Sequence, residues 1–486
     1  MKVEPIKLAP DLTISRVITG LWQIADMERD GHQLDLEQTA GAMTPYLHAG
    51  FSTFDMADHY GSAELIAGIF NKKLAGNHPV QLLTKWVPSP GVVTKHDVRA
   101  AVQRALNRLQ VHRIDLMQFH AWNYADPRWL DCLFWLQELQ DEGLIGHLGL
   151  TNFDSAHLGI VLNSGIKVVS NQVSYSLLDQ RAANSMTDLC LKHQVKLLAF
   201  GTIAGGFLTS KWLNTAEPSS KQLATWSEMK YKRFIVAAGG WTRFQTLLQV
   251  LATIANEKHV SISNIASRYI LEQPAVGGII IGARLGKSEH IEENLKLFDF
   301  SLDAKYKSEI QQALALLDPI PGNCGDEYRK PPFLTASGDL SHHVESMPAP
   351  YPIKKGSDGR TKALSGTTWE DLAGFSRAVR KGNRIFVSGT TATHGSKSIG
   401  GNDAAAQAHF IIDKIEGALL SLGGKLEEVV RTRIFIRNIS DWEVIARVHG
   451  ERFKDIQPAN TMVRADLIGD EYLVEIEAEA IITKKD

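Results

Sequence analysis

The sequence predicts an α/β chain made of a TIM (β/α)8 barrel followed by a small α+β domain. Its 486 residues are too many for one hydrophobic core and suit two or three domains. Up to about Leu317, short apolar runs alternate with longer segments of helical period, and beyond it this pattern ends. We therefore divide the chain into a barrel over residues 1–317, a linker over 318–364 and a second domain over 365–486.

Eight strand-like runs carry the prediction of the barrel. Most of them are apolar throughout, as expected for strands that are covered on both faces. Eight strand–helix units in about 300 residues fit a TIM barrel. An open, doubly wound sheet is the alternative, but no GxGxxG follows the first run. The runs are residues 17–21, 52–57, 81–86, 114–120, 145–152, 168–175, 196–202 and 277–283.

The segments between these runs have the apolar spacing of helices. In residues 98–109, for example, apolar side chains recur every three or four positions and place the arginines on the other face. An alternating stretch at 6–14 predicts a hairpin that closes the bottom of the barrel. Residues 205–242 carry three tryptophans and are too many for a plain connection, so we expect a lid or a binding loop there.

The second part of the chain begins after a proline-rich stretch. Residues 318–364 have little periodicity and predict an ordered or semi-ordered linker. A β-β-α-β-α-β-β order then follows, in which Asp441 is the expected cap of the second helix. The expected strands are 373–379, 384–388, 429–436, 459–468 and 472–482, and the expected helices are 403–422 and 441–453.

Composition excludes several classes of function. A formal net charge of −2 gives no electrostatic case for nucleic acid or an anionic membrane. No apolar run approaches the ~20 residues of a membrane span, and the N-terminus lacks an apolar signal core. Three widely spaced cysteines without a CxxC argue against a disulfide framework or a metal site. We expect a soluble, cytoplasmic protein without a metal.

Four polar residues lie at the ends of consecutive strand-like runs. Asp55, Lys85 and His120 are each the last or nearly last polar residue of the second, third and fourth runs, and Tyr60 opens the loop after the second. Active sites of TIM barrels lie at the C-terminal ends of the strands, so these side chains are expected to converge. A lysine ammonium would lower the pKa of the tyrosine, and Asp55 would keep the lysine charged and oriented. Tyr60 could then exchange a proton with a substrate carbonyl while His120 orients the oxygen.

At this point the residues resemble a known family. The segment Phe54-Asp55-Met56-Ala57-Asp58-His59-Tyr60-Gly61-x-x-Glu64 is similar to the signature of the aldo-keto reductases, with Met56 in place of the usual threonine. The resemblance covers about residues 7–317 and implies that Asp55, Tyr60, Lys85 and His120 are the catalytic tetrad. It also implies a set of residues for the nicotinamide. These are Thr151 and Asn152, which would hold its carboxamide with Gln172, and Phe200, which would stack on its ring.

The same resemblance implies NADP as the cofactor. The segment 281–294 is similar to the family's adenosine-phosphate site, where Arg284 and Lys287 at a helix start would hold a 2′-phosphate, together with Ser288 and Asn294. From the residues alone, this segment is a basic helix start with Ser288 as a candidate cap, and a solvated surface remains the alternative.

Four segments of the second domain, Gly374–Val379, Ile385–Thr390, Pro458–Val463 and Val474–Ala478, are similar to segments of the RidA/YjgF family. The resemblance spans about residues 365–484 and implies that family's small, chorismate-mutase-like α+β fold. Members typically form trimers, and the best-known ones hydrolyse enamines and imines. This chain departs from the deaminase pattern, since Asn460 replaces the arginine that binds the substrate carboxylate and Phe375 replaces a tyrosine. Glu475 matches the carboxylate that positions water, although its alternation with Glu477 and Glu479 also fits a solvent-facing strand.

The sequence therefore predicts an NADP-dependent oxidoreductase that interconverts a carbonyl (aldehyde, ketone or sugar) and an alcohol. Its second domain would serve in oligomerisation, with a trimer expected, or in ligand binding. Two alternatives stay open: a bifunctional reductase and imine hydrolase, and a non-catalytic NADP(H) redox sensor.

Overall fold

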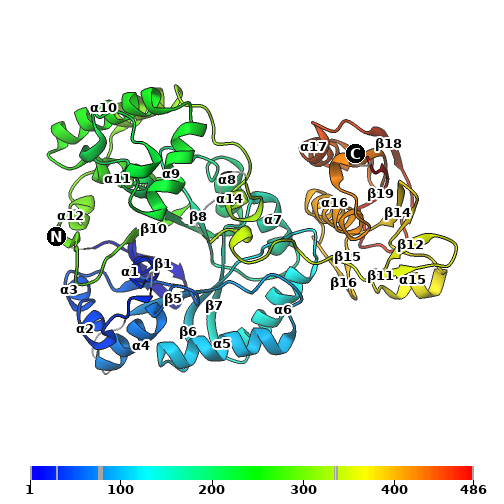
Figure 1. Cartoon of the computed structure of the whole chain (residues 1–486), viewed down its shortest axis with the longest axis horizontal. Helices are drawn as coiled ribbons and strands as arrows, with labels where there is room; N and C mark the ends of the chain where they lie inside the picture. The colour runs from blue at the N-terminus through cyan, green and yellow to red at the C-terminus, as the bar shows by residue number, and fades with distance from the viewer. Residues whose placement is uncertain (1–2, 29–30, 75–79, 333, 335–337, 484–486) are drawn as a thin grey trace. The chain divides into compact units, whose positions relative to one another are not determined.

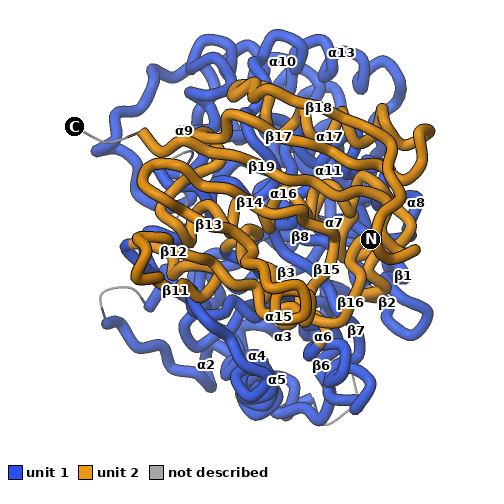
Figure 2. The backbone as a smooth tube through the Cα atoms, turned by 90° about the vertical axis from the view of Figure 1, so that its right-hand side faces the viewer, with its two compact units in different colours: residues 1–122, 135–155, 168–345 blue, residues 123–134, 156–167, 346–486 orange. Residues whose placement is uncertain are grey.

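The structure of the chain is a computed structural model, and it describes residues 3–28, 31–74, 80–332, 334 and 338–483. It divides into two compact units, shown in different colours in Figure 2. Unit 1 comprises residues 1–122, 135–155 and 168–345, and unit 2 comprises residues 123–134, 156–167 and 346–486. Within the described part of the chain, no helix is both long and apolar enough to span a membrane.

A closed parallel barrel forms the centre of the first part of the chain, and the predicted fold class is confirmed. The strand order around the barrel is β10-β3-β4-β5-β6-β7-β8-β9. Each of the eight predicted runs corresponds to one strand, because each is apolar and buried between the barrel interior and the surrounding helices. The strands are β3 (Val17–Gly20), β4 (Thr53–Asp55), β5 (Gln81–Trp86), β6 (Ile114–Phe119), β7 (Ile145–Thr151), β8 (Ser170–Ser174), β9 (Lys196–Phe200) and β10 (Val276–Gly282).

Helices alternate with the strands along this part of the chain, and those of unit 1 such as α4 and α5 lie outside the barrel (Figure 1). The segment predicted at 98–109 is α5 (Lys95–Leu109), which starts at a capping box between Thr94 and Asp97. The others are α1 (Gln23–Met27), α2 (Leu36–Gly41), α3 (Thr44–His48), α4 (Ala63–Leu74), α6 (Arg128–Asp141), α7 (Ser155–Asn163), α8 (Ser185–His193), α9 (Trp226–Ala237), α10 (Trp241–Lys258), α11 (Ile262–Leu271), α12 (Ile291–Leu295), α13 (Ala304–Leu314) and α14 (Asp326–Arg329).

The bottom of the barrel is closed by the predicted hairpin. Strands β1 (Pro5–Ala9) and β2 (Leu12–Ser15) pair antiparallel. Their apolar side chains form one buried cluster with side chains from four barrel strands. The cluster includes Leu8, Leu12, Ile14, Ile18, Leu83, Leu116 and Leu198. This packing leaves the opposite, C-terminal end of the strands for chemistry.

The long connection at 205–242 is more regular than expected. It contains α9, which starts at a capping box between Thr225 and Glu228. Trp212 and Trp241 are buried, with ring centroids 6.0 Å apart. Both therefore belong to the core of unit 1 rather than to an exposed binding surface.

A seven-stranded sheet with one covered face forms the body of unit 2. The strand order is β11-β12-β13-β14-β19-β17-β18, and all pairs are antiparallel except β17 with β18. Helix α16 (Ala404–Ser421) packs against β14 and β19, and α17 (Trp442–Phe453) packs against α16. The strands are β11 (Ile353–Lys355), β12 (Arg360–Ala363), β13 (Ala378–Lys381), β14 (Arg384–Thr390), β17 (Val429–Ile436), β18 (Ala459–Arg464) and β19 (Val474–Ile481).

Residues 318–364, predicted as an ordered or semi-ordered linker, divide between the two units. Residues 318–345 group with unit 1, and β11 and β12 extend the sheet of unit 2. One expectation for this part differs from the structure. The side chain of Asp441 was expected to cap α17, and this is wrong. It makes no capping bond and accepts instead from Asn438 and Ser440. The domain boundaries at 317 and 365 stay a prediction.

Candidate active site

The four predicted catalytic residues lie at one end of the barrel. Asp55 is the last residue of β4, Lys85 is near the end of β5, and His120 follows β6 directly. Tyr60 lies in the turn after β4, and its ring centroid is 4.9 Å from Lys85 Nζ. The structure brings all four together because parallel strands end on the same side of a barrel.

Lys85 and Asp55 form a buried ion pair. Lys85 Nζ is 2.6 Å from Asp55 Oδ2, and both side chains are only 4% exposed. Lys85 also donates to the carbonyl of Met56 at 2.8 Å. The other carboxylate oxygen accepts from Gln118 Nε2 at 3.1 Å and from Gln172 Nε2 at 2.8 Å. A single carboxylate thus orients the lysine and two amides, as a buried charge requires.

The expected direction of the Tyr60 pKa is wrong. Burial raises this pKa well above its usual value near 10, with further contributions from Asp55, Tyr328 and Asp58. Burial also lowers the pKa of Lys85, against the opposing effect of Asp55. The reason is that burial disfavours the charged phenolate, and the negative charge of Asp55 disfavours it further. A tyrosine that stays protonated is suited to donate a proton to a carbonyl oxygen.

His120 is held as a neutral imidazole with one free nitrogen. Burial and the nearby Arg329 lower its pKa well below its usual range. Its Nδ1 lies 3.4 Å from the carbonyl oxygen of Thr151. Its Nε2 is buried and finds no hydrogen-bond partner among the described residues. An unpaired buried nitrogen, at the same end of the barrel as Tyr60 and Lys85, is open to a hydrogen bond from a ligand.

Residues predicted for the nicotinamide lie at the ends of the next strands. Thr151 ends β7 and donates to the carbonyl of Gln172 at 3.3 Å. Asn152 has a left-handed backbone with φ 61°, and its buried Oδ1 has no partner in the described part of the chain. Gln172 lies in β8 and is bonded to Asp55, while Phe200 ends β9 with its ring partly exposed. An unpaired amide oxygen after β7 and a partly exposed ring at the end of β9 are the kinds of group that a carboxamide-bearing aromatic ligand needs.

The basic segment after β10 is not a helix start. Arg284 to Ser288 form a tight turn, in which the amides of Lys287 and Ser288 donate to the carbonyl of Arg284 at 2.9 and 3.0 Å. Helix α12 begins only at Ile291, so the expectation that Ser288 caps it is wrong. Arg284 pairs with Asp26 at 2.7 Å. Lys287 and Ser288 are exposed, and Asn294, in α12, is half-buried.

Three further residues border this site, and the sequence analysis did not find them. Gln118 donates a hydrogen bond to Asp55. A glutamine two residues before His120 in an otherwise apolar strand is a sequence signal that could have indicated this residue. Tyr328 and Arg329 come from α14 in the stretch expected as a linker. Arg329 donates to the carbonyls of Ala121 and Asn152 at 2.7 and 2.6 Å. No sequence pattern places this stretch at the end of the barrel.

The candidate residues of unit 2 do not form a complete catalytic set. Asn460 is exposed on β18 and donates to Thr432 Oγ1 at 2.9 Å. The guanidinium of Arg377 lies over the ring of Phe375, 5.5 Å from the ring centroid. Burial raises the pKa of Glu475, and Arg377 opposes this. Glu477 and Glu479 differ from Glu475 because both pair with Arg433.

Comparison with known proteins assigns the first part of the chain. Residues 16–315 match the model of the aldo/keto reductase family. The chain belongs to the aldo/keto reductase family. Residues 367–482 match the family model described as endoribonuclease L-PSP, which confirms the RidA/YjgF resemblance. The tetrad and nucleotide residues of this aldo/keto reductase stay predictions, supported by the geometry above.

Individual relatives match one part or the other. The NADH-specific methylglyoxal reductase of Escherichia coli is 24% identical and covers 63% of this chain and 97% of its own. The structure of the glycerol dehydrogenase AKR11B4 of Gluconobacter oxydans covers 66% of this chain and 97% of its own, with a TM-score of 0.54 at 21% identity. An uncharacterized protein of Streptomyces coelicolor is 34% identical over 125 residues, 26% of this chain and 93% of its own. At 21% identity, the dehydrogenase structure shows the barrel fold alone.

Proposed function

We propose that the barrel is an NADP(H)-dependent oxidoreductase that interconverts a carbonyl compound and an alcohol. The observation that carries this proposal is the unpaired Nε2 of His120 at the same end of the barrel as a protonated Tyr60 and the Lys85–Asp55 pair. The nicotinamide nucleotide supplies or accepts the hydride when it is bound. Thr151, Asn152 and Phe200 would hold its nicotinamide end, since Asn152 offers a buried unpaired oxygen.

The side chains of the site divide the remaining work. Because His120 Nδ1 donates to the carbonyl of Thr151, Nε2 of the neutral ring is an acceptor, and it would hold the hydroxyl of the alcohol form of the substrate and fix its direction. Tyr60 would give its proton to the same oxygen as the carbon is reduced, and take it back in the reverse direction. Lys85 stabilises the phenolate that forms during this transfer, while Asp55 holds the lysine in place.

A substrate panel tests the proposal. We expect the full chain to oxidise NADPH in the presence of one or more aldehydes, ketones or sugars. Tyr60→Phe should lower the rate about 10²–10⁴-fold, the range for a general acid. Tyr306→Phe is the matched control, because Tyr306 bonds Glu257 on the outer helices. The proposal fails if no carbonyl supports oxidation or if Tyr60→Phe leaves the rate unchanged. Turnover would also exclude the redox-sensor alternative.

The preference for NADP(H) rests on Arg284 and Lys287. The relative named as NADH-specific shows that similar chains can differ in this preference. Removing two charge-assisted contacts, in Arg284→Met with Lys287→Met, should raise the KM for NADPH by about 10–100-fold. The KM for NADH should change little. Equal effects on both nucleotides would mean that this turn does not recognise the 2′-phosphate.

We further propose that unit 2 assembles copies of the chain, with a trimer expected. On the sheet face that points away from α16, the exposed side chains include Phe386 and Val463. Light scattering of the full chain tests this, and Phe386→Lys should reduce the mass. A monomer at micromolar concentration would contradict it. The bifunctional alternative requires ammonia release from an imine precursor that Glu475→Ala abolishes.

A further inference from the structure

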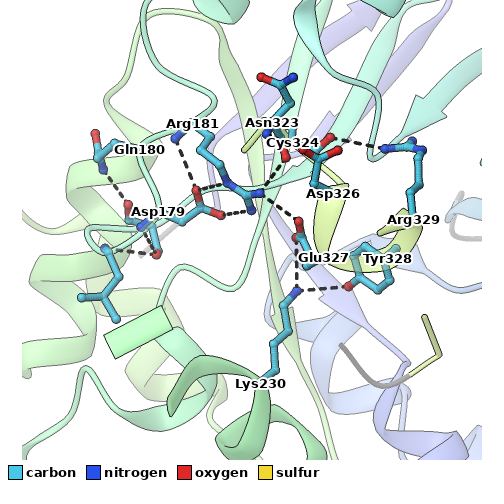
Figure 3. Close-up of polar contacts among 12 residues, drawn as sticks. Asp179, Gln180, Arg181, Lys230, Asn323, Cys324, Asp326, Glu327, Tyr328 and Arg329 are labelled. Carbon is cyan, nitrogen blue, oxygen red and sulfur yellow. Dashed lines mark hydrogen bonds and ion pairs between the residues drawn. The ribbon is translucent and has the colours of Figure 1, made fainter. Parts of the chain in front are cut away.

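A buried charge cluster supports a tyrosine beside the tetrad (Figure 3). Arg181 pairs with Asp179 at 2.7 Å and with Glu327 at 3.0 Å. Lys230 Nζ lies 3.6 Å from Glu327 and donates to the hydroxyl of Tyr328 at 3.1 Å. Two cations and two carboxylates balance, so the cluster has no net charge. A buried, charge-balanced cluster of this kind restricts the positions of its members.

The backbone around this tyrosine is equally constrained. Arg181 also donates to the carbonyl of Asn323 at 2.6 Å, and Arg329 holds two carbonyls at the ends of β6 and β7. Gly325 has φ 84°, and a Cβ there would lie 2.2 Å from the carbonyl oxygen of Asn152. Only glycine allows this approach. Tyr328 is therefore held from both sides of its position in the chain.

Tyr328 lies between the two ends of the candidate site. Its ring meets the ring of His120 edge-on, with centroids 6.2 Å apart. Its hydroxyl accepts from Lys230, whose ammonium lies 5.0 Å from the ring centroid of Phe200. His120 is the candidate partner of the reacting oxygen and Phe200 that of the nicotinamide ring. Tyr328 thus flanks the region where a substrate would lie between them.

The hydroxyl proton of Tyr328 has no acceptor among the described residues. Lys230 occupies the oxygen as a donor, so the proton must point elsewhere. Burial raises the pKa of this hydroxyl, which therefore remains a donor at neutral pH. Tyr328 as a residue is partly exposed rather than enclosed in the core. A fixed and uncommitted donor at this position is arranged to meet a ligand oxygen.

We propose that Tyr328 donates a hydrogen bond to a second oxygen of the substrate. The inference rests on the proposed function and deepens it, since it names the substrate class. The substrates would be carbonyl compounds, and the corresponding alcohols, that carry a hydroxyl on the carbon next to the reacting one. Lys230 is then a positioning residue that orients the hydroxyl of Tyr328.

A pair of aldehydes that differ by one hydroxyl tests this proposal. The probes are 2-hydroxypropanal and propanal, each measured with NADPH and with NADH on the full chain. We expect the wild type to have the higher kcat/KM for 2-hydroxypropanal. Tyr328→Phe, which keeps the ring on His120, should lower the ratio of the two kcat/KM values about tenfold, equal to about 1.4 kcal/mol. Tyr306→Phe should leave the ratio unchanged.

Each other outcome overturns a defined part of the reasoning. If Tyr328→Phe lowers both kcat/KM values in parallel, Tyr328 only packs against His120 and the proposal is wrong. An unchanged ratio, or a wild type that does not favour 2-hydroxypropanal, also overturns it. Turnover of propanal in these cases would leave the proposed function standing. If the wild type turns over neither aldehyde, the inference falls, and the wider carbonyl panel decides the proposed function.

Discussion

The burial of the Asp55–Lys85 ion pair determines how much stability the protein should lose when the pair is broken. Asp55→Asn removes the charge and keeps the shape of the side chain. Lys85, 4% exposed, would then lack both water and a counter-ion, and two amides would lose a carboxylate acceptor. Breaking a buried pair in this way costs about 3–5 kcal/mol. The barrel should therefore open more readily around β4 and β5.

Hydrogen exchange of peptides that contain these strands measures the loss directly. A cost of about 3–5 kcal/mol corresponds to exchange about 10²–10⁴-fold faster for globally protected amides. Asp11→Asn is the matched control, since Asp11 is an exposed carboxylate at the bottom of the barrel that also has two side-chain partners, Arg113 and His147. Adding Lys85→Met to Asp55→Asn should recover most of the protection, because no uncompensated charge remains. Equal exchange in Asp55→Asn and Asp11→Asn would refute the buried pair.

Two further predictions concern His120 and Arg329. The folded-state pKa of His120 is depressed, so below about pH 6.5 the unfolded chain binds a proton that the folded chain does not. The stability that the neutral His120 contributes is therefore lost as the pH falls, by up to about 1.4 kcal/mol per pH unit. Denaturation between pH 7 and 5 should show a shallower slope in His120→Gln, and an unchanged slope would contradict the prediction. Arg329→Met leaves two buried carbonyls unpaired, at about 1–3 kcal/mol each. This variant should increase the hydrogen-exchange rate of residues 318–332 and raise the pKa of His120 in the pH–rate profile. The control Arg243→Met, which breaks an exposed ion pair with Asp318, should have neither effect.

Local sequence patterns account for most of the fold. Apolar runs and strand-end polar residues predicted the barrel and the position of the tetrad, because a parallel barrel forces the ends of its strands together. Helix boundaries were harder where the cue was a single side chain. Ser288 and Asp441 both resemble caps in the sequence. Asp441 instead accepts from Asn438 and Ser440, and Ser288 lies in a turn that ends before α12 begins.

The remaining features depend on contacts between distant segments. The pKa of Tyr60 depends on burial and on Asp55, Asp58 and Tyr328 together, so a lysine in sequence reach could not decide its direction. Arg329 stands in a polar, proline-rich stretch and finds its acceptors on β6 and β7, 208 and 177 residues earlier. Such long-range pairing leaves no periodic trace in the sequence.

The anchoring of residues 318–345 changes where the catalytic part of this chain ends. The match to the aldo/keto reductase family model ends at residue 315, before α14 begins. Cutting the gene at that point would remove both the hydroxyl beside His120 and the guanidinium that lowers its pKa. Insertions, fusions and shortened versions of this protein should therefore keep everything up to Glu345 with the barrel, and the junction that tolerates change should lie beyond it.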